Sequence, residues 1–169
     1  YIFTTDHKMI AKQFLISGMF WAVIGGLMSV VFRLQLGFPE ASLEFLKPVL
    51  GGWITEAGKL DQEFYLALVT MHGTIMVFFV LTAGLSGTFS NLLIPLQIGA
   101  RDMASGFINM LSYWFFFASS VVMAASLFIE AGPASGGWTI YPPLSALPQA
   151  MPGSGLGMTM WLISMTLFV

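Results

Sequence analysis

Three ionisable side chains of this sequence lie inside or at the ends of long apolar runs, namely Arg33, His72 and Asp102. An ionisable group in a membrane-spanning segment costs free energy, so it is a functional candidate by default. The imidazole offers a metal ligand, the guanidinium a fixed cation and the carboxylate a proton acceptor. Metal binding and proton transfer are therefore the chemistries that these side chains could carry.

His72 lies about eight residues into the second apolar run, roughly 12 Å below the outer surface at 1.5 Å per residue. Neutral imidazole is the commonest metal ligand and can bind a haem iron axially. Gly73 beside it leaves room for a bulky planar group. A histidine that only hydrogen-bonds a neighbouring helix fits the same pattern, so both interpretations stay open.

Arg33 ends the first apolar run and shares one helical face with a stripe of small residues. The stripe consists of Gly18, Ala22, Gly25, Gly26 and Ser29. Such a face permits close approach of a neighbouring helix or a flat ligand. In an antiparallel pair of spans, Arg33 and His72 would lie at a similar depth in the outer half, which suits a haem. Snorkelling of Arg33 to the interface and close helix packing are the alternatives.

Asp102 follows Arg101 at the opposite, inner end of the spans. As a carboxylate that collects protons, it would stand at the mouth of a pathway. Asn91 and Asn109 could hold a water chain there, because their amides both donate and accept hydrogen bonds. As a solvated ion pair in a turn, Asp102 and Arg101 would contribute little. The residues alone favour neither interpretation.

Trp138 and Tyr141 belong to an outer connection that contains Gly-Gly-Trp-Thr-Ile-Tyr-Pro-Pro. The glycines and prolines on either side indicate a defined loop conformation. The indole N–H and the phenol O–H could then contact a polar group beneath the loop. Interfacial anchoring by aromatic side chains is also frequent, and it is the simpler alternative.

The composition decides what kind of elements position these residues. Of 169 residues, 57% are hydrophobic and 8% charged, with a formal net charge of −2. A soluble domain carries about 25% charged residues, so the chain is predicted to be a membrane protein. Low charge excludes a disordered chain, and the absence of a basic face argues against nucleic-acid binding. Without Cys there is no disulfide, thiol nucleophile or Cys-ligated metal.

Charge-free stretches predict where the chain crosses the membrane, because a crossing needs about 20 apolar residues. No Asp, Glu, Lys or Arg occurs between residues 65 and 100, which is more than one crossing requires. We therefore expect the second span to end near Phe89, with residues 91–101 and their Pro95 forming an irregular exit. The expected spans are residues 13–36, 64–89, 103–129 and 156–169, the last being truncated.

The basic residues predict the orientation of these spans. Lys8 and Lys12 precede the first span and Arg101 lies between the second and third, so this side is expected to be the cytoplasm or matrix. The predicted fold is all-α: three transmembrane helices and the start of a fourth from a larger bundle. Residues 1–169 would form one part of a single membrane domain, and because the chain stops in an apolar run we expect a longer protein.

At this point the sequence resembles subunit I of the haem–copper terminal oxidases, the cytochrome c and quinol oxidase family, along essentially all 169 residues. A lone His-Gly pair would be weak evidence, whereas an ordered series of motifs at compatible spacings is specific. The motifs are Thr5-Asp6-His7-Lys8, Arg33-Leu34-Gln35-Leu36-Gly37, Met71-His72-Gly73-Thr74-Ile75-Met76, Phe78-Phe79, Asn91, Pro95-Leu96-Gln97-Ile98-Gly99-Ala100-Arg101-Asp102-Met103-Ala104, Asn109, Ser112-Tyr113-Trp114, Glu130-Ala131-Gly132 and Gly137-Trp138-Thr139-Ile140-Tyr141-Pro142-Pro143-Leu144.

The resemblance implies roles for the outer candidates. His72 matches an axial ligand of the low-spin haem iron, whose second ligand would lie on a later helix. Arg33 is similar to the arginine that hydrogen-bonds a ring substituent of that haem. Trp138 matches a residue near the haem propionates, and Tyr141 belongs to the same loop.

The resemblance also implies an activity for the whole subunit. Asp102 is similar to the entry acid of a proton pathway, and Asn91 and Asn109 match its polar lining. Electrons would pass from the low-spin haem, expected to be haem a, to a high-spin haem paired with copper. There dioxygen would be reduced to water while protons are pumped. The ligands of the copper and of the high-spin haem would lie beyond Val169.

The implied partners are subunits of types II and III, cytochrome c or quinol as electron donor, dioxygen and membrane lipid, with no nucleic acid. Arg101 resembles the bacterial forms, so the implied location is a bacterial inner membrane crossed several times. Three positions depart from the family. Ser105-Gly106-Phe107 replaces Phe-Pro-Arg, Phe14 replaces a tyrosine, and Gln35 replaces a glutamate that helps to bind a structural cation, so no such site is predicted.

Three other functions fit parts of the pattern. A proton-coupled secondary transporter would use Arg33, His72 and Asp102 as its route, although inverted repeats and broken helices, typical of such folds, are not apparent. A di-haem cytochrome b needs repeated histidines within one helix, and the second span has only one. A purely structural membrane subunit would not need Arg33 and His72 in apolar runs.

Overall fold

The computed structural model describes residues 2–129, 132–147, 149–150 and 155–169. The described residues form helices, turns and one isolated β-bridge, between Ile54 and Leu60. The elements in chain order are α1 (His7–Gly37), η1 (Glu44–Leu46), α2 (Lys47–Leu50), η2 (Gly51–Trp53), α3 (Gln62–Thr74), η3 (Ile75–Ser86), α4 (Gly87–Ile98), α5 (Gly106–Ser126) and α6 (Leu156–Phe168).

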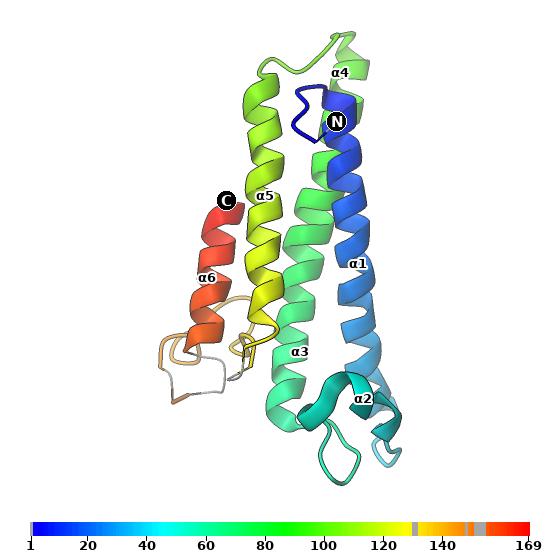
Figure 1. Cartoon of the computed structure of the whole chain (residues 1–169), viewed down its shortest axis with the longest axis vertical. Helices are drawn as coiled ribbons and strands as arrows, with labels where there is room; N and C mark the ends of the chain where they lie inside the picture. Colours follow the sequence, from blue (N-terminus) through cyan, green and yellow to red (C-terminus); the bar gives the residue numbers. More distant parts are fainter. Residues whose placement is uncertain (1, 130–131, 148, 151–154) are drawn as a thin grey trace.

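Three helices within the described residues are long and apolar enough to cross a membrane: His7–Gly37, Gln62–Ile98 and Gly106–Ser126. They run alongside one another, with α6 beside α5 (Figure 1). The N-terminal residues and the α4–α5 connection lie at one end, here called the inner end. The α1–α3 connection lies at the other, the outer end. The predicted all-helical membrane fold is therefore confirmed.

The second span is one continuous helix made of α3, the π-helix η3 and α4. The expectation of an irregular exit from residue 91 onward is wrong, because α4 continues through Pro95 to Ile98. Gly99, with a φ of 70°, ends it in the left-handed conformation that glycine tolerates best. Proline removes the hydrogen bond to the carbonyl four residues earlier. In this chain the carbonyl oxygen of Asn91 accepts a hydrogen bond from His7 instead.

Aspartates cap the N-termini of two of the long helices. The side chain of Asp6 accepts hydrogen bonds from the backbone N–H groups of Lys8 and Met9, so α1 begins at His7 rather than near residue 13. Asp61 caps α3 in the same way through the N–H groups of Glu63 and Phe64. Each cap satisfies N–H groups that the first turn of a helix leaves without a partner.

A close crossing joins α1 to η3. A Cβ atom added to Gly18 would lie 2.6 Å from the Cα of Gly84, so neither position has room for a side chain. An aromatic core lies around this crossing. Without Cβ atoms at the two glycines the helices approach closely, so the side chains on either side of the crossing come into contact. The rings in mutual contact there include Phe14, Trp21, Phe79, Phe116 and Phe168.

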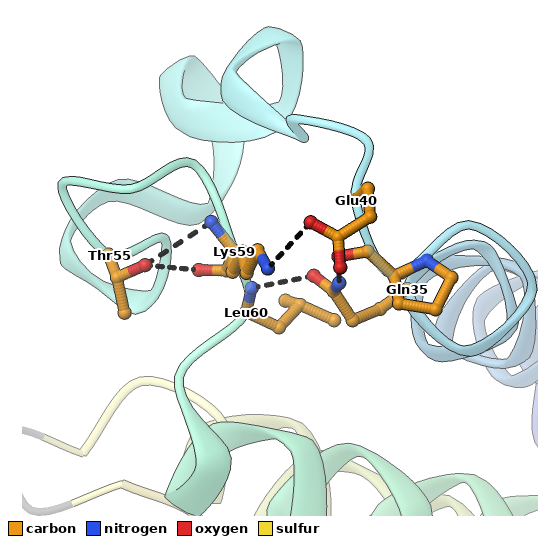
Figure 2. A network of polar contacts seen from close by, with 6 residues as sticks. Gln35, Glu40, Thr55, Lys59 and Leu60 are labelled. Atoms are coloured by element: carbon orange, nitrogen blue, oxygen red, sulfur yellow. Dashed lines mark hydrogen bonds and ion pairs between the residues drawn. The ribbon is translucent and has the colours of Figure 1, made fainter.

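The outer α1–α3 connection folds back onto the end of α1 (Figure 2). The side-chain oxygen of Gln35 accepts a hydrogen bond of 3.0 Å from the backbone N–H of Leu60. Lys59 lies 3.7 Å from the carboxylate of Glu40, and its backbone pairs with the hydroxyl of Thr55. A neutral amide at position 35 thus fastens the connection to α1 directly.

Candidate functional site

The ring of His72 is fixed by a backbone carbonyl of α1. Its Nδ1 lies 2.8 Å from the carbonyl oxygen of Gly25. Because a carbonyl can only accept, Nδ1 carries a proton, and in the neutral imidazole Nε2 then keeps its lone pair. The ring of Phe32 packs edge-on against the imidazole, with centroids 5.5 Å apart. Metal-ligating histidines typically donate their other N–H to a carbonyl or carboxylate, and this donation orients the ring.

Arg33 lies nearer the outer end than His72. The hydrogen bond places His72 level with Gly25, and residues 25 and 33 are eight positions apart, or about 12 Å along the helix. The expectation of a similar depth is therefore corrected: both are in the outer half, but in successive layers. Arg33 is exposed and has no hydrogen bond or ion pair with any residue that the structure describes.

The space beside Gly73 is occupied by the indole of Trp138. A Cβ atom at Gly73 would lie 3.1 Å from Cδ1 of that ring. The expected room for a planar group at this glycine is thus filled by the protein's own side chain. Gly26 of α1, in contrast, has nothing within 4 Å of an added Cβ. Of these two glycines it is Gly26 that leaves a surface open.

The outer loop is docked on α3 by its backbone. The N–H of Gly137, which has a φ of 87°, donates a hydrogen bond of 3.0 Å to the hydroxyl of Thr70. Trp138 also contacts Phe78 edge-on, with ring centroids 6.3 Å apart. Tyr141 lies farther along the loop and is 73% exposed, so the structure does not bring it to His72. The Glu130 of the preceding motif lies outside the described residues.

Asp102 lies at the inner end, in the turn between α4 and α5. Its Oδ1 accepts hydrogen bonds from the backbone N–H groups of Met103, at 2.8 Å, and of His7, at 3.3 Å. The carboxylate is exposed, as a group that collects protons from solvent must be. The described part of the chain shows no ion pair between Asp102 and Arg101. His7 is level with this turn and 18 positions from Gly25, so Asp102 and His72 are separated by about 27 Å along the helix.

Asn91 and Asn109 each have one buried amide atom without a partner in the described structure, Oδ1 of Asn91 and Nδ2 of Asn109. The other amide atom of Asn91, Nδ2, donates 2.8 Å to the carbonyl of Gly87. Buried polar atoms are nearly always hydrogen-bonded to protein or ordered water. An unpaired acceptor and an unpaired donor near the inner end are the atoms that a chain of water molecules would satisfy.

The structure reveals polar residues whose roles were not predicted from the sequence. His7 is 1% exposed and joins α1 to α4. The hydroxyls of Ser17 and Tyr113 lie 3.0 Å apart, and Phe14 packs edge-on against the same tyrosine ring. Tyr113 of α5 thus places a hydroxyl close to Phe14, which has none of its own. Thr70 carried a usable signal, since it shares a helical face with a second threonine one turn away, Thr74.

No cluster of three or more His, Asp or Glu side chains that could hold a metal ion occurs among the described residues. Each candidate acts instead from its own layer of the bundle. His72 can offer a single metal ligand, and Asp102 a single exposed carboxylate at the inner end. Arg33, His72 and Asp102 do not converge on one binding site.

The order of the motifs, the helical bundle and the fixed imidazole can be compared with known proteins. A family profile described as Cytochrome C and Quinol oxidase polypeptide I matches residues 9–169. The chain belongs to this family. Membership, together with the three long apolar helices, makes it an integral membrane protein of the oxidase subunit I class.

Several curated relatives of this oxidase family align with nearly the whole chain. The alternative cytochrome c oxidase subunit 1 of Bradyrhizobium diazoefficiens is 39% identical over 169 residues, covering 100% of this chain and 26% of that protein. The cytochrome c oxidase subunit 1 of Alkalihalophilus pseudofirmus is 40% identical over 162 residues, covering 96% and 22%. The heme-copper oxidase subunit I+III of Aeropyrum pernix is 36% identical over 156 residues, covering 92% and 17%. The chain thus spans about a quarter or less of their length.

Proposed function

We propose that this chain is part of the catalytic subunit of a respiratory terminal oxidase, which reduces dioxygen to water with electrons from cytochrome c or quinol and pumps protons. Family membership supports this proposal, and the observation that carries it is the hydrogen bond from His72 Nδ1 to Gly25. This segment would supply one ligand of the low-spin haem and the entrance of a proton pathway. The rest of the activity would require parts of the subunit outside these residues.

His72 is suited to ligate the iron of the low-spin haem. In the neutral ring its proton is held on Nδ1 by a backbone carbonyl, so Nε2 is the atom available to the metal. Phe32 restricts ring rotation from the outer side. A haem bound there would supply reversible one-electron transfer. Gly26 leaves open space on the surface of α1. Arg33 of α1, one layer nearer the outer end, would provide a cation for a polar substituent of the haem ring.

Asp102 is suited to admit protons from the inner side. It is exposed, and the N–H groups of His7 and Met103 hold its Oδ1. Deeper in the bundle, the unpaired amide atoms of Asn91 and Asn109 could bind the water molecules that conduct a proton. Asp102, Asn91 and Asn109 together would form the mouth of the proton pathway.

The proposed cofactors of the complete subunit are a low-spin haem of the a type, a high-spin haem and copper. Its proposed partners are the subunits of types II and III, the electron donor, dioxygen and membrane lipid. We propose a bacterial inner membrane as its location, on the resemblance at Arg101. Residues 1–169 would form part of one membrane domain.

The decisive experiment is a reduced-minus-oxidised optical spectrum of the purified oxidase, recorded with and without carbon monoxide. Wild-type protein should show a low-spin haem, and His72→Ala should lose that signal while protein of the same subunit is still present. Thr82→Ala, which changes an exposed residue of the same membrane-spanning helix, is the matched control and should keep the signal. A wild-type spectrum without haem would refute the oxidase proposal, and a normal spectrum of His72→Ala would refute the ligand.

A further inference from the structure

Three hydrogen bonds connect the outer loop, α3 and α6 through two threonines of α3, on a different face of that helix from His72. The N–H of Gly137 donates to the hydroxyl of Thr70, the hydroxyl of Thr74 donates 2.9 Å to the carbonyl oxygen of Thr70, and the indole of Trp161 donates 2.9 Å to the hydroxyl of Thr74. Thr70 and Thr74 are 3% and 0% exposed, and Trp161 is 4% exposed. Buried in an apolar setting, each bond would leave an unsatisfied polar group if it were broken.

The bond at Thr70 holds the residue that directly precedes Trp138. Gly137 directly precedes Trp138, and its positive φ turns the chain so that the indole passes over Gly73. The ring is held between this glycine and the edge of Phe78. Thr70 is bonded to Gly137, and the next residue, Trp138, covers Gly73. We therefore expect that removing the hydroxyl of Thr70 displaces the indole.

We propose that Thr70 is a positioning residue of the haem site. Its hydroxyl holds the Gly137 backbone so that the indole of Trp138 covers Gly73, the residue that directly follows the proposed ligand His72. This inference rests on the proposed function, since it assumes that His72 ligates the haem. Thr70 itself does not touch the haem. It acts through Trp138, whose indole covers the residue next to His72.

The first test compares two substitutions in the intact oxidase. Thr70→Val keeps the shape of the side chain and removes the hydroxyl, whereas Thr70→Ser keeps the hydroxyl. Thr70→Val should shift the absorption band and the midpoint potential of the low-spin haem at normal haem content, and Thr70→Ser should restore both. Thr82→Val is the matched control, because the hydroxyl of Thr82 is exposed and bonds only within its own helix, to Val77. It should shift neither quantity.

A second measurement does not depend on the haem. Hydrogen exchange of the peptide containing Gly137 should accelerate in Thr70→Val and stay at the wild-type rate in Thr70→Ser and Thr82→Val. The effect must also pass through the indole. In a Trp138→Phe background, Thr70→Val should therefore cause a smaller additional shift of the band than it causes in the wild type.

The outcomes separate this inference from the proposed function. If His72→Ala loses the low-spin signal but Thr70→Val leaves band, potential and exchange unchanged, the positioning role is overturned and the ligand stands. If His72→Ala keeps the signal, the proposed function fails by itself. If Thr70→Val does not assemble, Gly73→Ala tests the inference in its place. The added Cβ would lie only 3.1 Å from Cδ1 of Trp138, so the indole would have to move. An unshifted band in that variant overturns the inference.

Discussion

The Nδ1 atom of His7 lies 2.7 Å from the carbonyl oxygen of Asn91. This carbonyl is the one that Pro95, four residues later, leaves without its helical donor. A buried imidazole from the start of α1 thus completes the hydrogen bonding of α4. The same residue donates its backbone N–H to Asp102, so one histidine holds two groups of the proposed proton entrance.

His7→Ala should destabilise the inner end by about 1–3 kcal/mol, because it leaves the buried carbonyl of Asn91 unsatisfied. A lower midpoint of thermal unfolding in detergent would measure this loss. Pro95→Ala restores a backbone N–H to the same carbonyl, so in that background His7→Ala should cost clearly less. If His7→Ala lowers the stability equally with and without Pro95→Ala, then His7 does not replace the N–H donor that Pro95 removes. Lys8→Ala, at an exposed neighbour, serves as the control.

Asp102→Asn should slow turnover or abolish proton pumping while both haems stay in place, because an amide cannot release and recapture a proton at the entrance. Oxygen consumption and acidification by vesicles containing the purified oxidase would measure the two quantities. Glu56→Gln makes the same kind of change in the outer connection and should leave both intact. Pumping at the wild-type rate in Asp102→Asn would remove this residue from the pathway.

Arg33→Met should shift the absorption band of the low-spin haem, since it removes the cation one layer outside His72. Arg33→Lys keeps the charge but loses the planar donor geometry, so its band should lie between that of Arg33→Met and that of the wild type. The reduced-minus-oxidised spectrum measures these shifts, and Arg101→Met at the inner end is the control that should leave the band in place. An unshifted band in Arg33→Met would return Arg33 to the role of an interfacial anchor.

Gly18→Ala should destabilise the bundle by about 1–3 kcal/mol, because its Cβ would meet the Cα of Gly84 at 2.6 Å and two helix backbones would have to separate. Gly37→Ala adds the same atom at a position with nothing within 4 Å, and it should cost much less. Thermal unfolding of the two variants in the same detergent makes the comparison. Equal stability of both variants would contradict a tight crossing at Gly18.

Local properties of the sequence were enough to predict the class of the fold. The low charge and the long apolar runs determine that the chain crosses a membrane, because the cost of burying charge in lipid depends on residue type and run length alone. The positions of His72 and Asp102 in separate halves of the membrane follow from the same counting. The order of the motifs was also sufficient to predict the family, which the match over residues 9–169 confirms.

Tertiary contacts decided the features that were missed or placed wrongly from the sequence. The helix continues through Pro95 because His7, 84 positions before Asn91, supplies a donor to the carbonyl of that residue. The depth of His72 is set by Gly25, 47 positions away, and this bond separates it from the layer of Arg33. Hydrogen bonds between segments so distant in the chain depend on how the helices pack, and neither run length nor local spacing contains that information.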